Sequence, residues 1–262
     1  MKNLRKYGKS PYTVAIIHGG PGAPGAVAPV ARELSKLTGV LEPLQTRDSL
    51  EGQVVELADV LKEHADLPVI LIGHSWGAFL GFIVAARYPA MVRKLILVGS
   101  GPFEQKYADN IDGDRLTRLS EKERIEAINL IDAIDGASAG EKDRSMGRLG
   151  ELFAKADTFD ALPPEKEPDP LPVSEEINRK VWAGGKRLRV SGELLRMGEK
   201  IKCPVVAIHG DYDPHLAEGV RSPLSRVLKD FKFILLGKCG HEPWLERFAR
   251  DRFYEILRDE IQ

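Results

Sequence analysis

The chain has 262 residues, which is enough to bury a large core and is common for one α/β domain with or without an insertion. An apolar fraction of 43% and a charged fraction of 29% are ordinary for a globular protein, and a formal net charge of −1 argues against a nucleic-acid partner or an acidic membrane surface. Two cysteines cannot build a disulfide framework, and no apolar run is long enough for a membrane span or a signal peptide, so we expect a soluble, cytoplasmic protein.

Short apolar runs rich in β-branched residues alternate with longer runs of helical spacing. In chain order these patterns predict strand 13–17, helix 26–37, strand 39–44, helix 53–64, strand 69–72, helix 78–87, strand 94–98, strand 204–208, strand 231–236 and a closing helix 244–257. Apolar strands separated by helices indicate a parallel sheet covered on both faces, and right-handed crossovers make such a sheet doubly wound. The predicted fold class is therefore α/β, with a doubly wound and mostly parallel sheet.

The alternation of strand and helix patterns stops between residues 103 and 200, where the sequence is helical in pattern and carries charges of both signs. Because this segment lies between two strands of the predicted sheet, we predict a helical lid at 103–200, inserted into a core formed by 1–102 and 201–262. The alternative is a solvated helical excursion that takes no part in substrate binding.

Local signals place helices within the inserted segment. Ser120 and Glu123 have the capping-box spacing that opens a helix, and we expect this helix to run to about Ile134. Apolar positions between 146 and 153 suggest a second helix, and Ser174 opens a third. Residues 162–172 form a proline- and acid-rich connector that is too proline-dense for a central strand.

Gly73-His74-Ser75-Trp76-Gly77 matches the Gly-x-Ser-x-Gly turn that presents a nucleophilic serine, with an apolar strand before it and an apolar helix after it. The backbone in such a turn is strained, so the neighbours two positions away on each side must be small. The turn lifts the Ser75 hydroxyl above the carboxyl edge of the sheet, where open α/β sheets bind ligands. The N–H of Trp76, at the helix start, can then face a developing oxyanion.

A second glycine-rich turn, His18-Gly19-Gly20-Pro21-Gly22, ends the first strong strand. Glycines let backbone approach a substrate closely, and we expect the N–H of Gly20 to complete the oxyanion hole together with that of Trp76. Without the serine turn, the same residues would be an ordinary strand-to-helix connection.

A serine hydroxyl needs a base, and the base needs an orienting acid. His241 follows the last predicted strand, where it can reach Ser75. Asp211 and Asp213 both follow the strand before it, and on an extended loop they point to the same side, so their position alone does not separate them. The order Ser, Asp, His along the chain is the one that this arrangement requires.

The remaining titratable and aromatic residues carry weaker signals. We expect His18, His74 and His209 to hold loops by hydrogen bonds, His64 and His215 to lie at the surface, Cys203 and Cys239 to be buried free thiols, and Trp182 and Trp244 to pack in the core or line a pocket. No clustered ligands at metal-site spacing occur in the sequence, so we expect no metal site.

The motifs Gly73–Gly77, His209–Asp213 and Gly240–His241 resemble those of the α/β-hydrolase superfamily in order and spacing, across nearly the whole chain. In that superfamily the acid usually follows His-Gly by two intervening residues, so the resemblance implies Asp213 rather than Asp211. It also implies hydrolysis through an acyl-enzyme without cofactor or metal, and a helical lid after the strand that ends near Gly99.

More narrowly, His18–Gly22 with Ser75-Trp76-Gly77 looks like the proline iminopeptidase branch, whose members remove N-terminal proline from peptides. This chain reads Glu42-Pro43-Leu44-Gln45-Thr46-Arg47-Asp48 where the branch usually carries an Asp-Gln-Arg-Gly-type turn. Only about 17 residues precede His18, so we expect the antiparallel strands that usually open the fold to be shortened or missing.

Together these patterns predict acyl transfer to water on a small-molecule or short-peptide substrate. Ser75 would attack an ester or amide carbonyl, His241 would take its proton, Asp213 would stabilise the imidazolium, and the N–H groups of Gly20 and Trp76 would hold the oxyanion. An aminopeptidase of the proline iminopeptidase type is one specific form. The alternatives are a carboxylesterase or thioesterase, a C–C bond hydrolase using the same triad, or a non-catalytic ligand-binding protein on the same scaffold.

Overall fold

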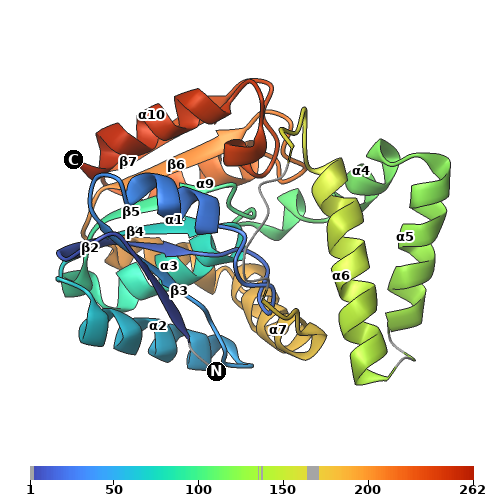
Figure 1. Cartoon of the computed structure of the whole chain (residues 1–262), viewed down its shortest axis with the longest axis horizontal. Helices are drawn as coiled ribbons and strands as arrows, with labels where there is room; N and C mark the ends of the chain where they lie inside the picture. Colours follow the sequence, from blue (N-terminus) through green and yellow to red (C-terminus); the bar gives the residue numbers. More distant parts are fainter. Residues whose placement is uncertain (1–2, 135, 137, 164–170) are drawn as a thin grey trace.

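The computed structural model describes residues 3–134, 136, 138–163 and 171–262, and it folds the alternating strands and helices into one sheet flanked by helices (Figure 1). The strands are β1 (Leu4–Tyr7), β2 (Tyr12–Ile17), β3 (Gly39–Pro43), β4 (Val69–His74), β5 (Val92–Val98), β6 (Val205–Gly210) and β7 (Phe231–Leu236). The α-helices are α1 (Ala28–Leu34), α2 (Leu50–His64), α3 (Trp76–Arg87), α4 (Ile111–Arg118), α5 (Glu121–Ile134), α6 (Ala139–Ala156), α7 (Glu175–Val190), α8 (Glu193–Arg196), α9 (Glu218–Val227) and α10 (Arg250–Ile261). Short 3-10 helices span Pro89–Met91, Gln105–Tyr107, Met197–Lys200 and Pro243–Leu245.

The seven strands lie in the order β1-β3-β2-β4-β5-β6-β7, and all are parallel except β1, which runs antiparallel to β3. This topology confirms the predicted doubly wound, mostly parallel sheet. The strands β2, β4, β5 and β6 are parallel neighbours, so their carboxyl ends meet at one edge of the sheet. Loops that leave these strands therefore converge on one place, even though they are far apart in the sequence.

The sheet has an apolar cluster on each face, because consecutive strand residues point to opposite sides. In β4, Leu71 packs into the cluster shared with α2 and α3, whereas Ile70 and Ile72 pack into the cluster shared with α1 and α10. Every residue of α3 except Arg87 is buried. Full burial of one large aliphatic side chain stabilises the fold by about 1.5–3 kcal/mol, so the start of α3 is held firmly against the sheet.

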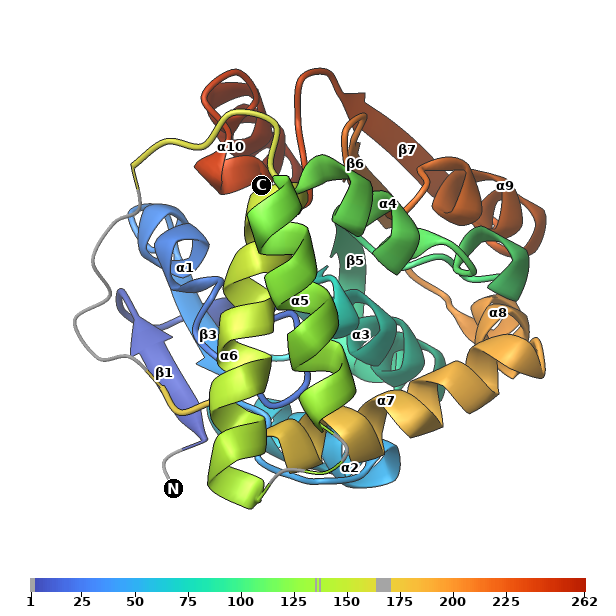
Figure 2. The same ribbon diagram turned by 90° about the vertical axis from the view of Figure 1, so that its right-hand side faces the viewer.

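Helices α4 to α8 lie between β5 and β6 in the chain, and α5 and α6 project from the sheet as a hairpin (Figures 1 and 2). A small apolar cluster, formed by Leu119, Ala127, Leu152 and Ala156, holds these two helices together. The predicted capping box opens α5, with the Ser120 hydroxyl 2.6 Å from the Glu123 carboxylate, and the Ser174 side chain accepts a hydrogen bond from the N–H of Ile177 at the start of α7. The division of the chain into a core and a lid stays a prediction.

Several element boundaries differ from the sequence-based expectation. The opening antiparallel strand, by contrast, is short as expected: it is β1, which has four residues and lies at the sheet edge. The closing helix begins at Arg250 rather than Trp244, because Pro243 opens a separate 3-10 turn first. Within the proline-rich connector, residues 164–170 lie outside the described residues. No helix in the described ranges is long and apolar enough to cross a membrane.

Candidate active site

Ser75 stands on a sharp turn between β4 and α3. Its backbone has φ 52° and ψ −115°, a conformation that non-glycine residues adopt rarely and at an energetic cost. The Ser75 N–H donates to the carbonyl of Val98 at 3.0 Å, which joins the turn to the end of the neighbouring strand β5. A Cβ at Gly73 would lie 2.2 Å from the carbonyl oxygen of Gly77, and a Cβ at Gly77 would lie 2.4 Å from that of Ile17. Both positions therefore require glycine.

The two expected oxyanion donors lie beside Ser75. Trp76 is the first residue of α3, so its N–H is one of the helix-start donors that have no acceptor within the helix. Gly20 has φ 50° and lines the same cavity as Ser75. A Cβ on the preceding Gly19 would lie 3.0 Å from the Cβ of Ser75, so only a glycine lets this loop approach so closely.

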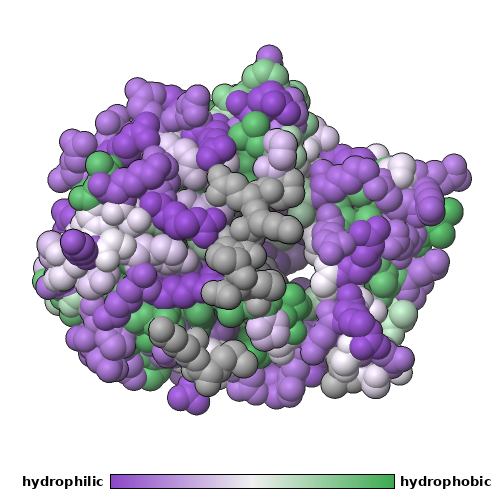
Figure 3. Space-filling view, in the orientation of Figure 1, coloured by the Kyte–Doolittle hydropathy of each residue, from purple (hydrophilic) through white to green (hydrophobic). Residues whose placement is uncertain are grey.

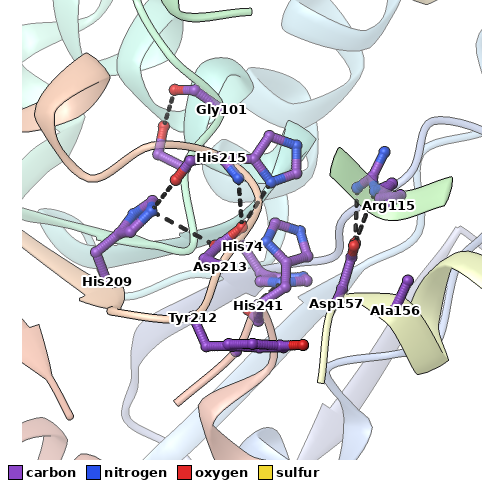
Figure 4. A network of polar contacts seen from close by, with 12 residues as sticks. His74, Gly101, Arg115, Ala156, Asp157, His209, Tyr212, Asp213, His215 and His241 are labelled. Atoms are coloured by element: carbon purple, nitrogen blue, oxygen red, sulfur yellow. Dashed lines mark hydrogen bonds and ion pairs between the residues drawn. The ribbon is translucent and has the colours of Figure 1, made fainter. Parts of the chain in front are cut away.

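The loop after β7 brings His241 to Asp213, which follows β6 (Figure 4). His241 Nδ1 lies 2.8 Å from Asp213 Oδ2. Asp211 is exposed, and its Oδ1 accepts a hydrogen bond from the N–H of Cys239 at 3.1 Å, as a turn-forming aspartate does. The structure thus brings Asp213 rather than Asp211 to the imidazole.

The surroundings of Asp213 and His241 shift the pKa values of the two residues in opposite directions. Burial alone would lower the pKa of His241, but the charge of Asp213 and the hydrogen bond to it outweigh burial and raise that pKa above its ordinary value. Burial would raise the pKa of Asp213, and the nearby imidazoles of His241, His215 and His209 hold it well below its ordinary value instead. Asp213 is therefore an anion at neutral pH, positioned to stabilise an imidazolium on His241.

His215 corrects a sequence-based expectation, because it is buried and not at the surface. Its N–H and its Nδ1 lie 2.9 and 2.8 Å from Asp213 Oδ1, and its ring stacks on that of His241 with centroids 4.6 Å apart. Burial lowers the pKa of His215 to about 4, so at neutral pH it is an uncharged donor to the carboxylate. The signal in the sequence was the Asp-Pro-His spacing, since an aspartate side chain often accepts from the N–H two residues later.

The other three histidines near the site hold loops, as expected. His74 Nε2 lies 3.2 Å from the carbonyl oxygen of His241, and His209 Nε2 lies 2.5 Å from that of His215. His18 Nδ1 lies 2.7 Å from the carbonyl oxygen of Gly19, in the glycine-rich loop. Each ring thereby fixes backbone that touches Ser75 or the Asp213–His241 pair.

The remaining aromatic and thiol residues pack around this framework. The Trp76 ring packs edge-on against Trp182 at 5.2 Å, and the Trp244 ring packs edge-on against His74 at 4.7 Å. Cys239 is buried as expected, whereas Cys203 is partly exposed, contrary to the expectation of a buried thiol.

A cavity of about 300 Å³ opens above Ser75 and His241, and its opposite wall comes from α4 and α6. In Figure 3 the surface is hollowed between the body of the molecule and the arm that carries these helices. Arg115 and Asp157 in this wall form a partly buried ion pair at 2.7 Å. The backbone carbonyl of Asp157 also accepts a hydrogen bond from the N–H of His241 at 2.9 Å, so the inserted segment touches the histidine loop directly.

Glu242 adds a carboxyl group to the same cavity. Burial raises the pKa of Glu242 to about 7, and the charge of His241 only partly opposes this effect. Within the described part of the chain its carboxyl group has no hydrogen-bond partner, so it is available to a bound molecule. Sequence reasoning missed Glu242, and its position directly after the histidine was the signal that could have found it.

Asp213, His215 and His241 also place potential metal-binding atoms within 4.8 Å of one another. Both imidazole Nδ1 atoms lie at hydrogen-bond distance from the carboxylate between them. An acceptor held between two N–H donors fits a hydrogen-bonded triad better than a coordination sphere, in which the nitrogen atoms would have to be free of protons.

The chain matches the α/β hydrolase fold family over residues 49–248. A pimeloyl-(acyl-carrier protein) methyl ester esterase from Neisseria meningitidis serogroup A is 23% identical over 211 residues, which are 78% of this chain and 61% of the esterase, so the chain spans about three fifths of the length of that relative. Among solved structures, VinJ superposes with a TM-score of 0.67 at 18% identity, covering 98% of this chain and 93% of VinJ. A proline iminopeptidase from Mycobacterium smegmatis gives a TM-score of 0.63 at 15% identity, covering 98% and 93%.

Proposed function

Because the chain belongs to the α/β-hydrolase fold family, we propose that it is a serine hydrolase that cleaves an ester of a small acyl substrate through an acyl-enzyme. The observation that carries the proposal is the 2.8 Å contact between His241 Nδ1 and the Asp213 carboxylate, beside a cavity that also holds Ser75 on its strained turn. The family match and the hydrolases among the relatives confirm the broader prediction of a hydrolase enzyme.

In the first half of the proposed reaction, the Ser75 hydroxyl attacks the substrate carbonyl and passes its proton to His241 Nε2. Asp213 holds the Nδ1–H of the same ring and stabilises the positive charge that forms. The N–H groups of Gly20 and Trp76 receive the oxyanion, and loss of one such donor typically costs about 2.7–4 kcal/mol of barrier. His241 then donates its proton to the leaving alcohol, which departs and leaves an acyl-serine.

In the second half, water takes the place of the alcohol. His241 removes a proton from that water as the oxygen attacks the acyl-serine, and then returns the proton to Ser75. An ester is the favoured substrate because the esterase relative aligns with 78% of this chain, at 23% identity, and because an alcohol leaves more readily than an amine.

Labelling with a fluorophosphonate probe tests the proposed nucleophile. We expect the unaltered protein to be labelled and to hydrolyse p-nitrophenyl butyrate, and Ser75→Ala to lose both properties. Labelling of Ser75→Ala at the full rate would refute the assignment. No labelling of the unaltered protein would favour a non-catalytic ligand-binding protein on the same scaffold.

A second candidate, an aminopeptidase of the proline iminopeptidase type, is favoured by Glu242. This carboxyl group is free to accept hydrogen bonds in the cavity, and the ammonium group of a peptide N-terminus is a suitable donor. Hydrolysis of prolyl-p-nitroanilide, with a raised KM in Glu242→Gln, would support it. A panel that adds a thioester and a 1,5-diketone would separate thioesterase and C–C hydrolase activity from both candidates.

A further inference from the structure

A buried carboxylate that the proposed reaction does not use lies against the loop that carries His241. Glu246 follows the 3-10 turn Pro243–Leu245 and is fully buried. Its Oε1 accepts hydrogen bonds from the N–H groups of Gly240 at 2.7 Å and Phe159 at 2.8 Å, and its Oε2 accepts one from the N–H of Asp160 at 2.9 Å. Burial of a carboxylate is costly, and hydrogen bonds to its charged form offset that cost. Glu246 therefore depends on these backbone donors being in place.

The three donors belong to two segments that are far apart in the chain. Phe159 and Asp160 lie just beyond the end of α6, whereas Gly240 directly precedes the catalytic base. The two segments also run side by side, because Ala161 forms an antiparallel β-bridge with Glu246. The carboxylate thus joins the inserted segment to the histidine loop through hydrogen bonds that end on backbone at both sides.

The backbone on which His241 stands is held at two consecutive N–H groups. The first is that of Gly240, which donates to Glu246, and the second is that of His241, which donates to the carbonyl of Asp157 at 2.9 Å. A Cβ at Gly240 would lie 2.6 Å from Glu246 Oε1, so only a glycine lets the loop pass this carboxylate so closely. These contacts fix the backbone from which the imidazole extends, and hence the place of its Nε2 relative to Ser75.

We propose that Glu246 is a positioning residue for the base of the reaction, because its carboxylate ties the backbone before His241 to the segment that leaves α6. This inference rests on the proposed function, since it concerns the same triad. Proton transfer needs hydrogen-bond distance between Ser75 Oγ and His241 Nε2, and a misplacement of about 1 Å caused by a distant substitution can slow a reaction on the order of a hundredfold. Glu246 lies outside the lining of the catalytic cavity, so its loss should slow the chemical step and leave substrate binding almost unchanged.

Glu246→Gln and Glu246→Ala remove the carboxylate in two steps. The amide keeps one acceptor oxygen, which can still receive the bonds from Gly240 and Phe159, but it sets an NH2 group against the N–H of Asp160. With p-nitrophenyl butyrate we expect kcat to fall about tenfold in Glu246→Gln and on the order of a hundredfold in Glu246→Ala, with KM changed less than about twofold in both. The control Arg247→Gln breaks only the exposed contact between Arg247 Nε and Asp160 Oδ2 in the same pair of segments, and should leave kcat within about twofold of that of the unaltered protein.

The time course of labelling by a fluorophosphonate probe separates positioning from a general loss of structure. A displaced base should slow the labelling of Ser75 by a factor similar to the fall in kcat, although all of the protein is labelled in the end. A protein that is merely destabilised would be labelled at the full rate up to a lower end point, because only its folded fraction reacts.

The rate constant refers to the folded molecules alone, so it can be measured even where a variant folds only in part. Labelling of Glu246→Gln and Glu246→Ala at the full rate would overturn the proposal, and so would a fall in kcat of the same size in Arg247→Gln. An unaltered protein that is not labelled at all would instead contradict the proposed function itself, and this inference with it.

Discussion

Replacing Asp213 by asparagine tests the proposed mechanism most directly. The carboxylate receives three hydrogen bonds, two from His215 to Oδ1 and one from His241 to Oδ2, and all three partners are nitrogen donors or can become so. An amide has only one oxygen. If that oxygen keeps the two bonds to His215, the NH2 group faces His241 Nδ1, which must then act as an acceptor. The ring proton therefore sits on Nε2, and Nε2 can no longer accept the proton of Ser75.

The expected loss follows from this tautomer. In the best-studied triad the same substitution lowers kcat about ten thousand-fold, which corresponds to about 5.4 kcal/mol of barrier. We expect kcat/KM for p-nitrophenyl butyrate to fall by that order in Asp213→Asn. The matched control is Asp211→Asn, whose side chain accepts a hydrogen bond from the N–H of Cys239 in the exposed turn; this variant should change kcat/KM less than threefold. Activity of Asp213→Asn within tenfold of the unaltered enzyme, in a variant that unfolds at a similar temperature, would refute the assignment.

Three further outcomes follow from pKa values and packing. The pKa of His241 is raised and the reaction needs its neutral form, so kcat/KM should fall on acidification with a midpoint above pH 6.5; a rate that stays constant down to pH 5.5 would contradict this. In Gly77→Ala the new Cβ would lie 2.4 Å from the carbonyl oxygen of Ile17, so urea unfolding should show a free energy of unfolding lowered by about 1–3 kcal/mol. The control Gly147→Ala has open space around its Cβ, so its free energy of unfolding should rise by up to about 1 kcal/mol. The folded-state pKa of Glu242, about 7, lies above its ordinary value of 4.5, so the fold favours the neutral carboxyl group and loses stability as pH rises from 4.5 through 7. At pH 8, Glu242→Gln should therefore be more stable than the unaltered protein by up to about 3 kcal/mol. Near pH 4.5 the two proteins should be equally stable.

The sequence predicts the fold well because its strands are strongly apolar and are bounded by residues that end regular secondary structure. Val69–His74 and the helix after it are buried almost throughout, so local pattern and tertiary environment agree. The same agreement supports the position of Ser75, whose turn needs glycine at Gly73 and Gly77 for steric reasons that act within a few residues. Local rules of this kind can be read from one stretch of sequence.

The rest of the site depends on contacts between distant segments, and no local pattern encodes them. His215 looks like a surface residue until the loop after β7 lays His241 against its ring. Arg115 and Asp157 lie 42 positions apart in a segment of mixed charge, where their pairing and their place in the cavity wall cannot be distinguished from ordinary surface charge. The pKa of Glu242 is raised mainly by burial and further by the charges of Asp157 and Glu246, and all of these depend on the whole fold.

The contact between Asp157 and His241 has a consequence for how this enzyme could acquire new substrates. A Cβ at Gly240 would lie 1.9 Å from the Asp157 carbonyl oxygen, and the hydrogen bond to the His241 N–H uses that same oxygen, so at this point the inserted segment supports the histidine loop through its backbone. Side chains elsewhere on α4 and α6 can therefore vary, by selection or by design, without loosening the base. A helical segment transplanted from another hydrolase would work here only if its chain path delivered a carbonyl group to this one point, whatever residue carried it.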